Sequence, residues 1–235
     1  NFFKKNKINK IDLTSPHSVN IPGAVHAWYT MHKKFGKLDF VELFKSAEKY
    51  AAEGFPVHEI TALSWKNNIG KLKKNISSNK IFLKNGLAYN YGEIHKNPKL
   101  AKTLNAIGKN GIKDFYQGYI AEDIVKSLNK IGGLHAMDDF LAQKTIVSDT
   151  ITKKYKQKII HQCPPNGPGI TVLLMMGILQ KFNFDRIKPL SAERFHLQAE
   201  ATKIAYEIRE KVLSGPNFSK IDIKVRPTAS PDPFN

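Results

Sequence analysis

The chain has 235 residues, of which 41% are hydrophobic and 10% aromatic, so a disordered or collagen-like protein is excluded. Its formal net charge is +17, but every basic residue except Arg186, Arg194, Arg209 and Arg226 is a lysine. Dispersed lysines aid solubility and attract polyanions only weakly, whereas nucleic-acid readers depend on arginine. We therefore expect one large domain, or one and a half, with a sizeable core and no nucleic-acid partner.

The single cysteine, Cys163, excludes an internal disulfide and leaves a cytoplasmic or a periplasmic location open. The longest apolar run, Ile170 to Leu179, is far shorter than the ~20 residues of a membrane span, so no membrane span is expected. The chain starts at Asn1 without a methionine or an apolar signal region, and we expect that the natural protein begins earlier.

Residues 1–20 are polar and predict an extended N-terminal segment, because Pro16 disfavours a helix there. A helix is predicted from Pro22, which suits a first helical position, to a stop at Gly36. A second helix is predicted from Asp39, its cap, to Gly54. The apolar residues spaced for these two helices are Ile21, Val25, Trp28, His32 and Phe35, then Phe40, Leu43, Phe44, Ala47 and Ala51.

From residue 57 to residue 142 the pattern predicts helices with one irregular interruption. The predicted helices cover residues 57–75, the stretch after the Asn97-Pro98 cap, residues 117–131 and residues 138–142. The helical period fails over residues 77–94, where Asn85-Gly86 and the flanking β-formers predict a loop with strand fragments. Asp138 is the expected cap of the last of these helices.

The last third of the chain changes character. Residues 144–162 alternate β-formers with charges, which predicts two or three strands, at 145–147, 150–155 and 159–160. A buried helix over 170–182 and a long helix over 191–213 are expected next. The long helix carries the pairs Glu200–Lys203 and Glu207–Lys211 on one face, and its expected buried face is Leu197, Ala201, Ile204, Ala205, Ile208 and Val212. These elements predict an α+β fold that is predominantly helical.

The turn before the buried helix is Cys163-Pro164-Pro165-Asn166-Gly167-Pro168-Gly169. Its three prolines and two glycines impose an irregular backbone, and such turns often carry binding sites. We predict that Asn166 and Gly167 line a substrate pocket; the alternative is a tight structural corner. Backbone N–H groups at the start of the next helix suit an anion or a carbonyl oxygen.

Other residue patterns predict no cofactor and no metal. The eight histidines lack metal-ligand spacing, and neither a phosphate-binding glycine loop nor a Gly-x-Ser-x-Gly elbow is present. Cys163 follows His161 by two residues, but no acid accompanies the pair. We therefore expect Cys163 to be a small buried hydrophobic residue and not a nucleophile.

Several short motifs follow one another along the chain. The first two are Val19-Asn20-Ile21-Pro22-Gly23-Ala24-Val25 and Tyr50-Ala51-Ala52-Glu53-Gly54-Phe55-Pro56-Val57. Further motifs are Asn97 to Leu104, Phe115 to Gly118, Ile131 to Leu134, Asp138 to Phe140, Pro164 to Gly167, Phe195 to Ala201 and Ala205-Tyr206. Together they resemble the γ-glutamyltransferase (glutathione hydrolase) family. Each motif is short, but collinear matches over residues 19–219 make the resemblance specific.

The resemblance implies part of the αββα fold of N-terminal nucleophile hydrolases, from the later part of the large subunit. It implies a precursor that cuts itself before a threonine, which then attacks a small-molecule amide with its own α-amino group as base. That threonine lies in the small subunit, the implied partner, so no catalytic residue is expected in this chain. The implied parts are the extended segment 1–20, a large-subunit-like domain over 21–223 and a Pro-rich tail over 224–235.

Departures from the family pattern leave the substrate open. The run Pro165-Asn166-Gly167-Pro168-Gly169 is more similar to the acylase and small-amide hydrolase branches than to the Pro-Ser-Ser-Gly-Gly of many γ-glutamyl enzymes. The alternatives are therefore an acylase-type amidohydrolase of the same superfamily, a binding or structural module derived from the family, and a basic polyanion-binding protein.

Overall fold

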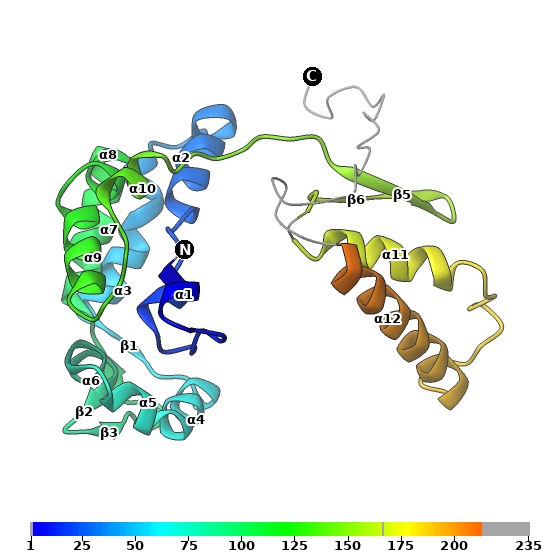
Figure 1. Cartoon of the computed structure of the whole chain (residues 1–235), viewed down its shortest axis with the longest axis horizontal. Helices are drawn as coiled ribbons and strands as arrows, with labels where there is room; N and C mark the ends of the chain where they lie inside the picture. The colour runs from blue at the N-terminus through cyan, green and yellow to red at the C-terminus, as the bar shows by residue number, and fades with distance from the viewer. Residues whose placement is uncertain (1, 166, 213–235) are drawn as a thin grey trace. The chain divides into compact units, whose positions relative to one another are not determined.

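The structure is a computed structural model that describes residues 2–165 and 167–212 (Figure 1). The described part is predominantly helical and contains three antiparallel two-stranded sheets, so the predicted α+β class is confirmed. The described residues divide into two compact units, with the division between Thr145 and Ile146. The division arises because helices within each unit pack on one another and bury their own apolar residues.

The N-terminal segment contains two short helical turns. α1 spans Phe2–Lys5 and the 3-10 helix η1 spans Pro16–Ser18. Pro16 occupies the first position of η1, where its missing N–H costs nothing, and the Ser15 hydroxyl accepts a hydrogen bond from the His17 N–H at 3.3 Å. Pro16 therefore starts a helical turn here, although an extended backbone is expected from the sequence.

The next elements are α2 (Ala24–Phe35), the 3-10 helix η2 (Phe40–Phe44) and α3 (Lys45–Glu53). α2 starts after the predicted Pro22, whose carbonyl oxygen instead accepts a hydrogen bond from the Tyr116 hydroxyl. Gly36 ends α2 as predicted, because its N–H bonds to the His32 carbonyl. Asp39 is the N-cap residue of η2, as predicted, but its side chain makes no capping hydrogen bond within the described residues.

Residues 55–95 form three short helices and two small sheets. The elements are α4 (Glu59–Asn67), α5 (Ile69–Lys73), α6 (Ile76–Phe82), β1 (Phe55–Pro56) paired with β4 (Ile94–His95), and β2 (Leu83–Lys84) paired with β3 (Leu87–Ala88). The loop predicted over 77–94 is wrong at α6, because the Asn75 side chain accepts the N–H groups of Ser77 and Ser78 at 2.9 and 3.1 Å. Asn85-Gly86 does form the turn between β2 and β3, with φ values of 52° and 77°.

Four helices complete the first unit: α7 (Pro98–Asn110), α8 (Lys113–Tyr116), α9 (Tyr119–Asn129) and α10 (Met137–Leu141). Asn97 caps α7 as predicted. The helix expected over 117–131 starts later, because the extended backbone of Gly118 separates α9 from α8. At α10 the capping acid is Asp139 and not the predicted Asp138, since the Asp139 carboxylate accepts the N–H of the N-cap residue at 2.8 Å.

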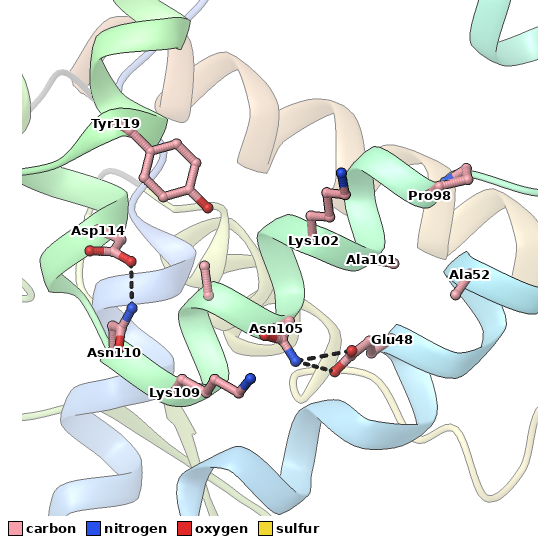
Figure 2. A pocket seen from close by; sticks show the side chains of 11 residues that line it. Glu48, Ala52, Pro98, Ala101, Lys102, Asn105, Lys109, Asn110, Asp114 and Tyr119 are labelled. Carbon is pink, nitrogen blue, oxygen red and sulfur yellow. Dashed lines mark hydrogen bonds between the residues drawn. The ribbon is translucent and has the colours of Figure 1, made fainter.

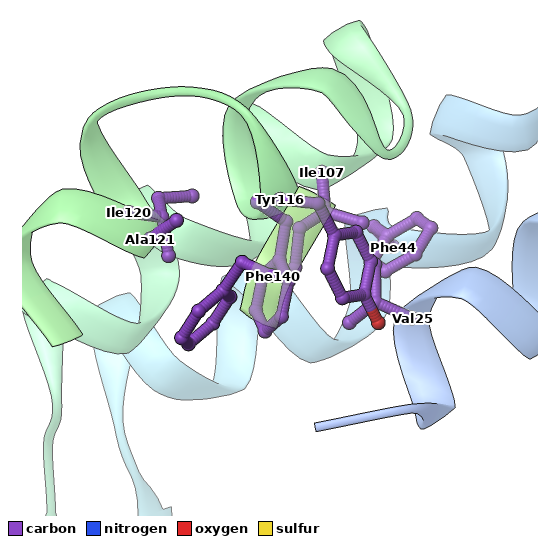
Figure 3. Packing of buried hydrophobic residues seen from close by; sticks show 8 residues of the cluster. Val25, Phe44, Ile107, Tyr116, Ile120, Ala121 and Phe140 are labelled. Atoms are coloured by element: carbon purple, nitrogen blue, oxygen red, sulfur yellow. The ribbon is translucent and has the colours of Figure 1, made fainter. Parts of the chain in front are cut away.

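The core of the first unit collects side chains from α2, η2, α7, α8, α9 and α10 (Figure 3). Its buried members are Val25, Phe44, Ile107, Phe115, Tyr116, Ile120, Ala121 and Phe140. Phe140 is 1% exposed, and full burial of such a ring contributes roughly 1.5–3 kcal/mol. The predicted apolar face of α2 is only partly buried, because Val25 lies in this core while Trp28 and Phe35 are exposed.

The second unit, as far as the structure describes it, contains one hairpin and two helices. β5 (Ile151–Tyr155) pairs antiparallel with β6 (Lys158–Gln162), and α11 (Gly169–Leu179) packs against both strands and against α12 (Ala192–Val212). Figure 1 shows α11 between the hairpin and α12. The strands predicted near 150–155 and 159–160 are confirmed, whereas residues 145–147 form no strand.

The two helices of this unit are less buried than predicted. Their buried residues include Gly169, Thr171 and Leu173 of α11 and Ala201 and Ala205 of α12. Val172, Ile204 and Ile208 are exposed, so the prediction that both apolar faces are wholly buried is wrong. Within the described residues, α11 packs against the hairpin and α12, whereas α12 packs mainly against α11.

The polar face of α12 agrees with the sequence analysis. Glu200 pairs with Lys203 at 2.9 Å and Glu207 pairs with Lys211 at 2.6 Å. Such exposed pairs contribute little to stability, because solvent screens the attraction between the charges. Residue 213 and the Pro-rich tail expected over 224–235 lie outside the described residues.

Candidate functional site

The turn Cys163 to Gly169, called the Pro/Gly turn below, joins the end of β6 to the first residue of α11. A Cβ atom at Gly169 would lie 2.7 Å from the Cys163 carbonyl oxygen and 2.8 Å from the Gln162 Cβ. Because real Cβ atoms do not approach backbone atoms so closely, only glycine lets α11 start directly against the strand. The predicted turn therefore brings the strand end and the helix start together.

The structure describes one of the two predicted pocket residues, Gly167. Asn166 lies outside the described residues. Gly167 is half-buried at a bend, and apart from its two chain neighbours no described residue has an atom within 4 Å of the position that a Cβ would take. The space beside Gly167 suits an approaching ligand atom as well as a plain turn, so the role of both residues in a substrate pocket stays a prediction.

Thr171 is a polar residue of this region that the sequence analysis missed. It lies two residues into α11, is 3% exposed, and its Oγ1 has no hydrogen-bond partner within the described part of the chain. A buried hydroxyl without a partner costs roughly 1–3 kcal/mol. The signal in the sequence was a single threonine within an otherwise apolar run.

The arrangement at Cys163 differs from the prediction. Cys163 is exposed, so the expectation of a buried hydrophobic residue is wrong. The residue follows Gln162, the last residue of β6, and lies in the irregular turn before α11. His161 also faces solvent, and its Nδ1 is 2.9 Å from the Thr150 hydroxyl.

A pocket of about 590 Å³ lies in the first unit, between α3, α7, α8 and α9 (Figure 2). Its lining comprises Glu48, Ala52, Pro98, Ala101, Lys102, Asn105, Ala106, Lys109, Asn110, Asp114 and Tyr119. Asn105 Nδ2 donates to both carboxylate oxygens of Glu48 at 3.0 Å, and Asn110 donates to Asp114. This pocket was not predicted, because its residues come from three separated stretches of sequence.

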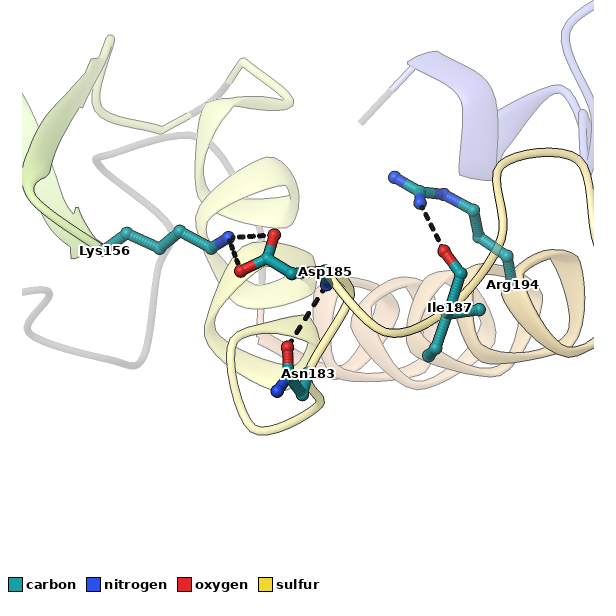
Figure 4. A network of polar contacts seen from close by, with 5 residues as sticks. All are labelled: Lys156, Asn183, Asp185, Ile187 and Arg194. Atoms are coloured by element: carbon teal, nitrogen blue, oxygen red, sulfur yellow. Dashed lines mark hydrogen bonds and ion pairs between the residues drawn. The ribbon is translucent and has the colours of Figure 1, made fainter.

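A smaller pocket of about 290 Å³ lies in the second unit, near the β5–β6 turn and α12. Figure 4 shows the Lys156 ammonium group bonded to both oxygens of Asp185, at 2.9 and 3.1 Å. This hydrogen bond raises the pKa of Lys156 above its ordinary value. The Arg194 guanidinium donates to the Ile187 carbonyl at 3.4 Å and lies 5.0 Å from the ring of Phe184. The side chains here hold the loop before α12.

Two general features concern metals and membranes. Within the described ranges, no three His, Cys, Asp or Glu side chains gather closely enough to hold a metal ion. The helices that the structure describes are all too short or too polar to cross a lipid bilayer.

Comparisons with known proteins agree on one family. The sequence model described as Gamma-glutamyltranspeptidase matches residues 1–232. The chain is 32% identical over 207 residues to the glutathione hydrolase-like YwrD proenzyme of Bacillus subtilis, which covers 88% of this chain and 39% of that protein. The chain thus spans less than half the length of this curated relative.

Solved structures show the same likeness. The γ-glutamyltranspeptidase of Helicobacter pylori has a TM-score of 0.82 at 27% identity, over 87% of this chain and 59% of that chain. The cephalosporin acylase of Bacillus halodurans has a TM-score of 0.87 at 26% identity, over 94% of this chain and 42% of that chain. Both similarities extend over nearly the whole described chain.

Proposed function

Because this chain belongs to the γ-glutamyltranspeptidase family, we propose that it is the later part of the large subunit of a γ-glutamyltransferase-like amidohydrolase. Its fold is a predominantly helical part of the N-terminal nucleophile hydrolase fold, like the H. pylori structure. The enzyme is made as a precursor, and the partner of this chain is a small subunit that begins with a threonine. The observation that carries this proposal is the family match over residues 1–232.

The proposed reaction is acyl transfer from a γ-glutamyl amide or a related amide. The threonine hydroxyl attacks the amide carbonyl, and its α-amino group takes the hydroxyl proton and passes it to the leaving amine. The resulting acyl ester is then attacked by water, which releases the acid, or by an acceptor amine, which gives a new amide. In this scheme the present chain supplies walls of the pocket, including Asn166 and Gly167, and no nucleophile.

The test compares the complete gene product with the 235-residue chain alone. The complete product is expected to cleave itself and to release nitroaniline from γ-glutamyl-p-nitroanilide, while the chain alone releases none. Activity from the chain alone contradicts the assignment of the nucleophile to the partner. A complete product that neither cleaves itself nor hydrolyses any amide supports the non-catalytic module instead.

An acylase-type amidohydrolase is the second candidate, and two observations favour it. The fold is as similar to a cephalosporin acylase, with a TM-score of 0.87, as to a γ-glutamyl enzyme, with 0.82. The turn sequence at residues 165–169 also resembles the acylase branch. Glutaryl-p-nitroanilide lacks only the α-amino group of γ-glutamyl-p-nitroanilide, so the ratio of kcat/KM for the two compounds decides between the candidates.

A further inference from the structure

The pocket between α3, α7, α8 and α9 differs in charge from the chain as a whole. Its charged lining residues are Lys102, Lys109, Glu48 and Asp114, two of each sign, whereas the chain carries a net charge of +17. Because these four charges cancel, the pocket favours neither a polyanion nor a simple cation. A ligand that carries one charge of each sign complements it best.

The four charges are available to such a ligand. Within the described part of the chain, no ion pair involves Lys102 or Lys109, and both side chains are exposed. Glu48 and Asp114 accept hydrogen bonds from neutral amides of α7. An amide orients a carboxylate without cancelling its charge, and a carboxylate has about four acceptor positions, so both acids can accept a further donor.

The positions of Lys102 on α7 and Asp114 on α8 set the length of the ligand. Residues 102 and 110 of α7 are about 12 Å apart along the helix axis, at 1.5 Å per residue. Asp114 is bonded to Asn110, so it marks the far end of this distance from Lys102 (Figure 2). An extended peptide of four residues spans about 13–14 Å at most. Its length therefore matches the axial separation of Lys102 and Asn110, the residue to which Asp114 is bonded.

The rest of the lining suits a peptide of this size. Small apolar side chains lie between the charges, namely those of Ala52, Pro98, Ala101 and Ala106. Tyr119 is 56% exposed and offers an aromatic ring with a hydroxyl group. A volume of about 590 Å³ falls within the range of sites for small organic ligands.

We propose that this pocket binds short peptides of about four residues through their free termini, with the carboxylate at Lys102 and the ammonium group at Asp114. The apolar lining takes the backbone and small side chains of the peptide. The proposal does not depend on the acyl-transfer function proposed above, because none of its residues belongs to the Pro/Gly turn.

The test is isothermal titration calorimetry of the full 235-residue chain with tetra-alanine as the probe. The free peptide is expected to bind about three- to fivefold more tightly than its N-acetyl form or its C-amide form, because partly exposed charge pairs contribute modestly. Equal affinities of the free and blocked peptides, or no binding of the free peptide, overturn the proposal.

Two variants assign the ends of the peptide. Lys102→Gln is expected to abolish the advantage of the free carboxylate and to keep that of the free amine, and Asp114→Asn is expected to do the reverse. Lys126→Gln and Asp123→Asn make the same charge changes at exposed positions of α9 outside the pocket, so they serve as controls.

Effects of the control variants that equal those of the pocket variants contradict the proposal. Asp114→Asn also alters a hydrogen bond to Asn110, so circular dichroism melting is recorded for every variant. If Asp114→Asn unfolds, the result with Lys102→Gln decides, since Lys102 makes no ion pair within the described residues.

Discussion

The Tyr116 hydroxyl donates a hydrogen bond to the carbonyl oxygen of Pro22, 94 residues earlier in the chain. The same hydroxyl accepts the N–H of His26 at 3.1 Å, so one side chain holds both the approach to α2 and its first turn. Tyr116 is 3% exposed, and burial raises the pKa of its phenol. The start of α2 thus depends on a residue of α8.

Tyr116→Phe is expected to lower the free energy of unfolding by about 1–3 kcal/mol, because the Pro22 carbonyl and the His26 N–H both lose a partly buried partner. Urea denaturation followed by circular dichroism measures this change. Tyr119→Phe removes an equivalent hydroxyl at an exposed position and is expected to change stability by no more than about 0.5 kcal/mol. Equal losses in the two variants would contradict the role of Tyr116.

The folded protein is expected to lose stability in weak acid because His95 is buried. Its ring is 4% exposed, lies within about 5–6 Å of aromatic rings and has an Nδ1 without a partner in the described part of the chain. The surrounding rings are Phe55, Trp65, Phe82 and Tyr89. Burial lowers the pKa of His95, so the folded state keeps the neutral form where the unfolded chain already binds a proton.

The direction of this pH dependence follows from the lower pKa of His95 in the folded state than in the unfolded chain. Stability is full above the unfolded pKa of His95, about 6.5, and falls as the pH drops from there toward the lowered folded pKa. Glu93 has a pKa lowered by its hydrogen bond to Asn90, so its contribution is lost only in stronger acid, below its ordinary value. His95→Phe is expected to flatten the dependence of the unfolding free energy between about pH 7.5 and pH 5.5. Identical slopes for variant and parent would refute this prediction.

Substitution by alanine is expected to have opposite effects on stability at Gly54 and at Gly70. Gly54 has a φ of 99°, and a Cβ there would lie 2.5 Å from the Ile94 Cγ2, so Gly54→Ala is expected to cost more than about 1 kcal/mol. Gly70 lies inside α5, and beyond its own helix and chain neighbours no described residue comes within 4 Å of its Cβ position, so Gly70→Ala is expected to add about 0.5–1 kcal/mol. Thermal melting of the two variants measures both signs, and a loss in both contradicts the assigned geometry.

Thr171→Val replaces a buried hydroxyl that has no partner with a methyl group of similar shape. In the chain alone this change is expected to leave stability unchanged or to raise it by about 1 kcal/mol, because no hydrogen bond is lost. A clear loss of stability in the chain alone contradicts the structure at this residue. A loss seen only in the complete gene product assigns the hydroxyl a partner there.

Asn166→Ala tests the proposed substrate pocket in the complete enzyme. If the side chain bonds to substrate, kcat/KM falls by about tenfold, the equivalent of one hydrogen bond of ~1.4 kcal/mol. Gln157→Ala, at an exposed position of the β5–β6 turn, is the control and is expected to leave kcat/KM unchanged. If Asn166→Ala changes only the melting temperature, Asn166 has the structural role of a tight corner and no role in substrate binding.

Much of the local structure could be predicted from the amino-acid sequence alone. The cap at Asn97, the stop at Gly36 and the turn at Asn85-Gly86 are all readable because each depends on a hydrogen bond or a backbone angle within a few residues. The Pro/Gly turn and the family motifs were found for the same reason. Such short-range effects do not require knowledge of which elements meet.

Burial and the pairing of distant groups needed the folded chain. Glu48 and Asn105 are 57 residues apart in sequence, yet they share one wall of the pocket. Cys163 and Thr171 lie eight residues apart, and only packing makes the first exposed and the second buried. Whether an apolar face is buried, and how strongly a charge interacts, depends on the surface that packs against it. That surface comes from another part of the chain.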